Sequence, residues 1–582
     1  MKGLKILISF FFGFTGLYCG CGWAQFMPAV ANKTYLLSHA GLGVPLKDLA
    51  DLRMAVVTAD AKKYQVFIDQ LNRYAHVEVL DFTEQGLHAN RFNTFIVTGT
   101  VDELKAQQLY LLQCGLVDKK NMVLCTFLTQ GQQAFLQLGG RVTELLYPGF
   151  SADAQRNMAM SIFGGLAITS GDVSQRTTQT RLQYTVDLGD TYDLGKMANR
   201  IDGIANEAIR ERATPGMVVM AVKDGQVIFE KSYGWHTYSR EQQTQVSDIF
   251  DLASVTKVVG TTPVIMHLQE IGVLNLDRTI GDYLPAARTT NKASIPLRAV
   301  LLHEAGFVPF IPFYKNLKPG DMQADSSATH QVKVAEGAYL RNFYYQDRMW
   351  PEMLMTDVKP MGNYLYSDIS MYVMQEIAET QTHTPIDKYV QQLLFDRLGM
   401  TTAGYNPWQR FDKSKIVPTE VDKSFRKGLL QGYVHDQGAA MAGGVAGHAG
   451  LFATANDLAI YGQLLLNRGH YGGLQFFKAQ TVDLFTSRQS KTSRRGLGFD
   501  RYDMDTKKEY PSKLANASVY GHTGYTGTCF WVDPENQLVY IFLSNRVHPD
   551  VSPKLLELNI RGRILDTIYE AIRQPKSSLI TL

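Results

Sequence analysis

The chain has 582 residues, of which 45% are hydrophobic and 19% charged, and its 58 basic and 55 acidic side chains leave a net charge of +3. This composition is typical of a folded protein with two to four domains and excludes a disordered or fibrous chain. The chain contains no long basic run, so nothing indicates a nucleic-acid partner.

Residues 1–24 have the three-part layout of a secretory signal peptide. Two lysines precede an apolar run, and small residues lead up to Ala24. Glycines interrupt the apolar run, which is short for a bilayer span of about 20 residues. We therefore expect cleavage after Ala24 and a periplasmic or secreted protein. An uncleaved anchor and a lipid on Cys21 are the open alternatives.

Three cysteines remain after the expected signal peptide: Cys114, Cys125 and Cys529. An odd number indicates no disulfide framework, and buried free thiols are favoured, although Cys114 and Cys125 could pair. No Cys/His cluster has metal-ligand spacing, so we expect no metal and no other cofactor.

Short apolar runs alternate with helical patterns between about residues 50 and 170. Strands are expected at 53–59, 77–82, 94–100, 121–129 and 142–150, and a helix at 62–74. The alternation predicts a doubly wound α/β domain, with an open, largely parallel sheet covered by helices on both faces. No GxGxxG motif follows the first strand, so a dinucleotide site is not expected.

The stretch "LLYPGFSADAQRNMAMSIFGGLAITSG" (145–171) resembles the C-terminal α/β domain of family 3 glycoside hydrolases. Those enzymes carry their nucleophile on a preceding barrel, and the expected signal peptide leaves no room for one. The resemblance implies a scaffolding domain without glycosidase activity. With a polar linker at 170–185, this domain would span 25–185.

A helix is expected at 196–212 and a β-hairpin at 216–234, before the stretch "DLASVTKVVG" (251–260). Ser254 and Lys257 lie three residues apart at an expected helix start, so they share one face. A lysine can activate a serine only if its pKa, normally about 10.4, is lowered. Taken alone, a helix cap and a surface cation explain the pair better.

Two later motifs change that interpretation. Tyr366-Ser367-Asp368 precedes an amphipathic helical pattern, and His522-Thr523-Gly524 stands at the start of an expected β-hairpin. Ser-x-x-Lys, Tyr-Ser-Asp and His-Thr-Gly in this order resemble the penicillin-recognising serine hydrolases, in the branch of class C β-lactamases, DD-carboxypeptidases, D-aminopeptidases and esterases. The stretches "LLHEAGF", "GGVAGHAGLFATANDLAIYGQLLL" and "RGLGFD" also fit that branch.

The resemblance implies a β-lactamase-like domain over residues 186–582: an antiparallel sheet flanked by helices plus an all-helical lobe. It implies that Ser254 is acylated and that Lys257 takes or shares its proton. Tyr366 would be the second candidate base and would later protonate the leaving group. The backbone N–H groups of Ser254 and Tyr525 would form the oxyanion hole.

The resemblance also implies substrate-binding roles for Asp368, Thr523 and Gly524, and a proton-relay role for His522. Two residues depart from the usual motifs. Asp368 replaces an asparagine; its carboxylate would hold Lys257 protonated and repel an anionic substrate, so we expect weak or no β-lactam turnover. His522 replaces the lysine of many β-lactamases and would grip a carboxylate less firmly at neutral pH.

Three more features have open interpretations. His448 and the pair His435-Asp436 lie in Gly-rich segments, where His448 could contact substrate or brace a loop. An aromatic insertion at 307–350 could form a wall or lid of the cleft, or simply pack.

The sequence thus predicts a secreted serine hydrolase that acts through an acyl-enzyme on a D-amino-acid peptide or an ester. Peptidoglycan fragments are candidate substrates, and no stable protein partner is implied. A non-catalytic binding protein on a decayed site is the alternative. Carbohydrate binding by the N-terminal domain is a further one.

Overall fold

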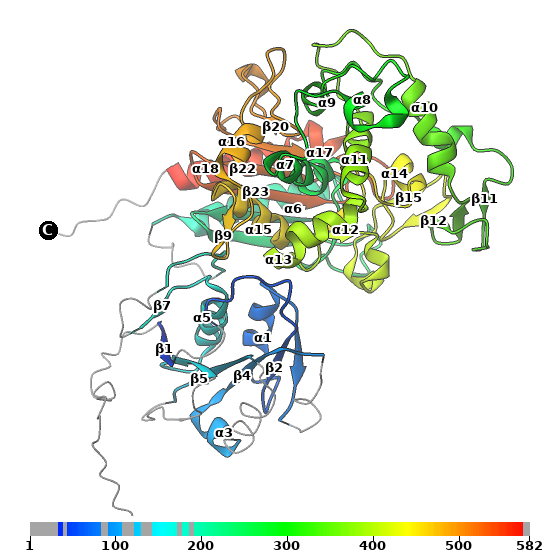
Figure 1. Ribbon diagram of the computed structural model, residues 1–582. Coiled ribbons are helices and arrows are strands. Elements are labelled where there is room, and N and C mark those ends of the chain that lie inside the picture. The colour runs from blue at the N-terminus through cyan, green and yellow to red at the C-terminus, as the bar shows by residue number, and fades with distance from the viewer. Residues whose placement is uncertain are drawn as a thin grey trace, which may run out of the picture.

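Two β-sheets organise the chain in the computed structural model, which describes residues 33–38, 43–82, 91–107, 121–129, 142–170, 177–184 and 191–573. The first sheet lies in the blue-to-cyan part of Figure 1 and the second at the centre of the part that runs from cyan to red. The expected signal peptide and Cys114 lie outside the described residues. Within them, no helix is long and apolar enough to cross a membrane.

The first sheet has seven strands in the order β3-β2-β4-β5-β6-β1-β7. The strands from β3 to β6 are parallel to their neighbours, and β1 runs antiparallel to β6. The bounds are β1 Thr34–Ser38, β2 Met54–Val57, β3 Val77–Leu80, β4 Thr94–Thr100, β5 Asn121–Phe127, β6 Val142–Tyr147 and β7 Ile168–Thr169. All five predicted strands are present, whereas β1 and β7 were not predicted.

Helices cover both faces of this sheet, as the doubly wound prediction requires. The helices α1 (Gln65–Asn72) and α5 (Ala152–Phe163) pack on one face, and α3 (Val101–Ala106) packs on the other. Every residue of β4 is buried, because neighbours along it point to opposite, covered faces. The continuous apolar run at 94–100 therefore reflects a strand inside a parallel sheet.

The second sheet is antiparallel, in the order β20-β21-β22-β23-β8-β9. Its bounds are β8 Gly216–Lys223, β9 Gln226–Gly234, β20 Asp500–Arg501, β21 Tyr520–Thr523, β22 Cys529–Asp533 and β23 Leu538–Ser544. Along β8, Val218 and Met220 join one core, while Met217 and Val219 join another. This alternation places a hydrophobic core on each face of the sheet.

The two cores are closed by different helices. On one face lie α6 (Leu194–Arg210) and α18 (Ile560–Arg573). On the other lie α15 (Ala455–Leu466) and a lobe that contains α7 Thr262–Glu270, α8 Ile280–Tyr283, α9 Leu297–Leu301, α10 Trp350–Met355, α11 Ile369–Thr382, α12 Ile386–Val390, α13 Asp396–Leu398, α14 Gln437–Met441 and α16 Ala479–Thr486. An antiparallel sheet with a helical lobe is the predicted β-lactamase-like architecture (Figure 1).

Buried hydrogen bonds fix the second half of the predicted linker, residues 177–184, in place. The Arg181 guanidinium donates to the carbonyl oxygens of Leu46, Lys47 and Phe163. Leu182 is fully buried, and its carbonyl oxygen accepts a hydrogen bond from the Tyr74 hydroxyl at 2.5 Å. This segment is therefore a connector that is buried at Arg181 and Leu182, although the Arg181 Nε and the Thr180 hydroxyl have no hydrogen-bond partner.

An ion pair joins the two sheet systems next to this connector. Arg73, which follows α1, donates to both carboxylate oxygens of Glu230 on β9 at 2.7 and 2.8 Å. Its guanidinium also donates to Asn456 of α15 at 3.2 Å and stacks 4.0 Å from the Tyr184 ring. These contacts are bidentate and partly buried, the geometry in which an ion pair contributes most.

We predict that Arg73→Ala destabilises the protein by about 3 kcal/mol, because it leaves the partly buried Glu230 carboxylate without its cation. Arg91→Ala is the matched control, since the Arg91–Glu78 pair is exposed and should contribute less than about 1 kcal/mol. Urea denaturation of both variants measures the difference. Equal losses would show that the Arg73 pair does not join the two halves.

Candidate active site

Ser254 lies at a strained turn after β10 (Phe250–Asp251). The residue before it, Ala253, has a φ of +46°, in the left-handed region that alanine rarely adopts. The Asp251 carboxylate stabilises this turn by accepting the Ala253 N–H at 2.8 Å. The expected α-helix start is instead a 3₁₀ turn, Ala253–Val255, and a π-helix, Lys257–Thr261, which leads into α7. Short segments of this kind are frequent at functional sites.

Lys257 is completely buried, so it is not a surface cation. Its ammonium group donates to the Ser254 Oγ at 2.8 Å, the Asp368 Oδ1 at 2.8 Å and the backbone oxygen of His448 at 3.2 Å. These three acceptors match the three protons of an ammonium group. Burial opposes the charge, but the Asp368 carboxylate outweighs it and raises the pKa of Lys257.

Tyr366, just before α11, contacts the same serine from another segment of the helical lobe. Its hydroxyl donates to the Ser254 Oγ at 3.1 Å. Burial raises the pKa of Tyr366, so its hydroxyl remains protonated and acts as a donor. The neighbouring residues fix this segment: Ser367 donates to the Val308 oxygen at 2.6 Å, and the Asp368 N–H donates to the Pro309 oxygen at 2.8 Å.

The His-Thr-Gly motif ends β21 and enters a turn that lies against the nucleophile. Thr526 and Thr528 donate to the backbone oxygens of Asp251 and Leu252 at 2.8 and 3.1 Å. These bonds hold the turn that carries the exposed Tyr525 beside the segment that carries Ser254. A side chain at Gly524 would place its Cβ 2.4 Å from the Leu252 oxygen, so the close approach requires glycine.

Both ring nitrogens of His522 are engaged. Nδ1 lies 2.7 Å from the Thr523 carbonyl oxygen, which can only accept, and Nε2 lies 3.2 Å from the Arg495 guanidinium, which can only donate. The ring is therefore neutral with its proton on Nδ1. Burial, with Arg495 and Lys257 nearby, lowers the pKa of His522 to about 3. This geometry leaves His522 as a partner of Arg495, with no ring nitrogen directed at Ser254.

Arg495 is the main site residue that motif reasoning missed, although it begins the stretch "RGLGFD". It is buried, and besides His522 it donates to the Tyr364 hydroxyl at 3.0 Å and lies 5.3 Å from the centre of the Tyr366 ring. Its guanidinium lies next to the neutral His522 and 3.6 Å from the buried Asp500 carboxylate.

His303, also missed, packs its ring 4.6 Å from the Tyr366 ring and accepts the Ser367 N–H at 3.2 Å. It therefore positions the second motif. No spacing rule connects either Arg495 or His303 to Ser254.

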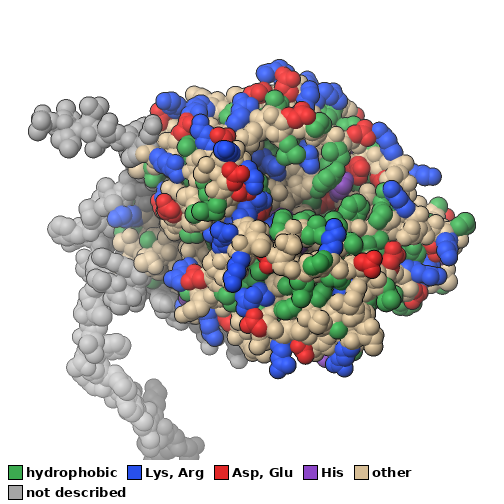
Figure 2. All heavy atoms as spheres, turned by 90° about the horizontal axis from the view of Figure 1, so that it is seen from above, with side chains coloured by type: hydrophobic (Ala, Val, Ile, Leu, Met, Phe, Trp, Pro, Cys, Tyr) green, Lys and Arg blue, Asp and Glu red, His purple; other side chains and the backbone are tan. Residues whose placement is uncertain are grey.

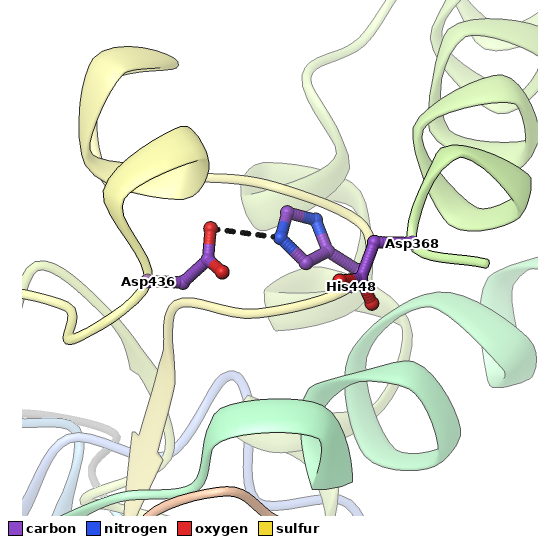
Figure 3. A group of neighbouring side chains, drawn as sticks. All are labelled: Asp368, Asp436 and His448. Atoms are coloured by element: carbon purple, nitrogen blue, oxygen red, sulfur yellow. Dashed lines mark hydrogen bonds and ion pairs between the residues drawn. The ribbon is translucent and has the colours of Figure 1, made fainter. Parts of the chain in front are cut away.

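His448 braces the loop from which its backbone oxygen reaches Lys257. Its Nε2 donates to the Asp436 carboxylate at 2.9 Å, as Figure 3 shows, and its side chain is 3% exposed. Burial disfavours the charge of Asp436, yet His448 and the Ala439 N–H hold the pKa of Asp436 below its usual range. The neighbouring His435 does not share this contact with Asp436, and the centre of its ring lies 5.3 Å from the centre of the Tyr525 ring.

The aromatic insertion divides into two parts. Its start braces the second motif through Val308 and Pro309, while residues further along form a small sheet, β11 Met322–Gln323, β13 Ala338–Leu340 and β12 Val332–Ala335. Phe310 keeps 66% of its surface exposed close to this brace. The face seen in Figure 2 is hollowed near its centre, with hydrophobic side chains around the hollow and charges of both signs interspersed.

Comparisons with known proteins identify the family of this chain. The model of the Beta-lactamase family matches residues 201–562. The chain belongs to the Beta-lactamase family. The resemblance stated for the three motifs is thereby confirmed, and the protein is a serine hydrolase of this family. The resemblance of the N-terminal domain to glycoside hydrolases stays a prediction.

Several relatives share this part of the chain. An Escherichia coli (strain K12) protein named "Putative D-alanyl-D-alanine carboxypeptidase" is 31% identical over 398 residues, which cover 62% of this chain and 87% of that protein. A Salmonella gallinarum protein of the same name is 27% identical over 410 residues, with 64% and 91% covered. A solved Beta-Lactamase/D-Alanine Carboxypeptidase from Pseudomonas syringae is 17% identical, with 64% and 99% covered and a TM-score of 0.48.

We predict that Asp368→Asn shifts the pH dependence of nucleophilic attack by Ser254 in this Beta-lactamase family member. A neutral Lys257 is needed to accept the serine proton, so the wild-type rate should rise with pH. Removing the carboxylate lowers the pKa of Lys257, and the acid limb should move down by about one unit or more. Rates of fluorophosphonate labelling in metal-free buffer measure this shift, with Asp483→Asn on the exposed face of α16 as control. An unmoved limb would mean that Lys257 is not the titrating base.

We further predict that Gly524→Ala slows labelling by about a hundredfold or more, because the added Cβ would displace the turn that holds an oxyanion donor. Gly203→Ala, in open space on α6, is the control and should leave the rate unchanged. Circular dichroism confirms that both variants fold. A normal rate in Gly524→Ala would argue against Tyr525 as the donor.

Proposed function

We propose that this protein is a secreted peptidase that forms an acyl-enzyme at Ser254 and acts on D-amino-acid peptides of the cell-wall type. The observation that carries this proposal is the convergence of Lys257 and Tyr366 on the Ser254 Oγ at 2.8 and 3.1 Å. One group can accept the serine proton, and the other can donate to the leaving amine.

The third motif suggests how the end of the peptide would bind. A D-alanyl-D-alanine peptide ends in a carboxylate, which needs a positive partner near the oxyanion turn. Arg495, Thr523 and the neutral His522 lie together there. The carboxypeptidase names of the bacterial relatives support the same substrate class. Because the Asp368 carboxylate pairs with Lys257 and raises the pKa of that lysine, weak or no turnover of β-lactams is part of the proposal.

An ester is the second candidate substrate. Phe310 and Tyr525 are 66% and 52% exposed on segments that adjoin the site, so an apolar acyl group would find contacts there. Secretion remains part of the proposal and rests on the layout of residues 1–24. The division into residues 1–24, 25–185 and 186–582 is likewise proposed, with a scaffolding role for the first domain.

The decisive experiment compares wild type with Ser254→Ala, and with Ser239→Ala on the exposed surface as the matched control. D-Alanine release from a diacyl-lysyl-D-alanyl-D-alanine peptide should fall by about a thousandfold or more only in Ser254→Ala. Mass spectrometry should find a fluorescent penicillin or fluorophosphonate on Ser254. Ester hydrolysis without D-alanine release would favour the esterase. No labelling and no turnover from about pH 5 to pH 9 would favour the binding protein.

A further inference from the structure

Three metal-ligating side chains from separate segments meet beside the active site (Figure 3). They are Asp368 at the start of α11, Asp436 just before α14, and His448 in the loop before β17 (Leu451–Ala453). One ligand atom from each lies within 4.8 Å of the other two. Figure 3 shows the Asp436 carboxylate directed at the imidazole and Asp368 beside it. The three side chains therefore need only small movements to share one ion.

Each carboxylate has one oxygen committed to the protein and one available. The Asp368 Oδ1 accepts from Lys257, and the Asp436 Oδ1 accepts from His448 and from the Ala439 N–H at 2.7 Å. In the described part of the chain, neither Oδ2 takes part in a hydrogen bond. The two side chains are 25% and 33% exposed, so an ion can reach them from solvent.

Two buried polar atoms next to these carboxylates lack a partner. They are the Nδ1 of His448 and the hydroxyl of Tyr372, and both residues are 3% exposed. The two rings lie 4.5 Å apart. The Tyr372 hydroxyl and the Asp436 Oδ1 approach the same point above Gly438, at 2.8 and 3.3 Å from where a Cβ would lie. The hydroxyl is thus directed toward the cluster, where an ion with its bound water would satisfy it.

Among the described residues, the two carboxylates have one lysine and no arginine as a partner between them. Lys257 balances one carboxylate, Asp368. Asp436 contacts no lysine or arginine side chain among the described residues. Most of the Asp436 side chain is withdrawn from solvent, and a metal or a bound group that supplies positive charge would stabilise a carboxylate in that position.

We propose that Asp368, Asp436 and His448 bind one divalent transition-metal ion, with Zn²⁺ and Mn²⁺ as the best matches. An imidazole and two carboxylates suit these ions, and three protein ligands leave a coordination position for water or substrate. The ion takes the outer oxygen of Asp368, and Lys257 keeps the inner one. When Nε2 of His448 binds the ion, Nδ1 carries the ring proton.

Isothermal titration of the EDTA-treated full chain with ZnCl₂, and separately with MnCl₂, tests the site. Wild type should bind one ion, and Asp436→Asn and His448→Gln should each weaken binding by about a hundredfold or more. Asp483→Asn, an exposed carboxylate paired with Arg468 on the surface, should bind like wild type. An anomalous-scattering peak between the three side chains in Zn²⁺-soaked crystals would confirm the ligands even if one variant fails to fold.

Ser254→Ala should bind the ion as wild type does, so the metal site and the hydrolase activity can fail independently. Absence of binding by either ion up to about 1 mM would overturn the proposal. Unchanged binding in Asp436→Asn and His448→Gln would also overturn it, since the ions would then sit elsewhere on the surface. If only D-lysine methyl ester binds, and Asp436→Asn abolishes that binding, the carboxylates recognise an ammonium group and the metal proposal falls.

Discussion

The active site depends on the burial of one ammonium group. Lys257 has no exposed surface, and its three acceptors come from the nucleophile turn, the start of α11 and the loop before β17. A charge removed from water must be fully hydrogen-bonded, or the fold does not tolerate it. The segments around Ser254 must therefore lie where they can supply the three hydrogen-bond acceptors of the Lys257 ammonium group.

That constraint explains which site residues the sequence could reveal. Ser254, Lys257, Tyr366 and the His-Thr-Gly turn stand in short motifs, because each motif occupies one local turn. Arg495 and His303 act through contacts with residues more than 20 positions away, so no spacing reveals them. Asp436 and His448 lie in Gly-rich segments that the sequence marks as candidate parts of the site. Their pairing depends on how these loops fold, which the sequence does not show.

The fold was largely predictable in segments where the spacing of the apolar residues and the length of the segment indicate the same type of element. The run at 94–100 and most of the run at 121–129 are strands in a covered parallel sheet, and side chains alternate along β8 between two hydrophobic cores. β1 was not predicted because it is a short strand between β6 and β7, and its pairing with β6 joins segments that lie far apart in the sequence. The nucleophile turn was expected to be α-helical, because no propensity rule anticipates a left-handed Ala253 followed by a π-helix.

The buried connector has a geometric consequence. Arg181 and Leu182 are buried between the two sheet systems, and Arg73 pairs with Glu230 on β9 beside them, so these contacts hold the two halves in one relative orientation. The orientation of the active site around Ser254 is therefore fixed relative to the first sheet. If a large polymer or a surface bound the first domain, its scissile bonds would reach Ser254 only at one distance and in one orientation. The first domain would then serve as a spacer that decides which bonds come within reach.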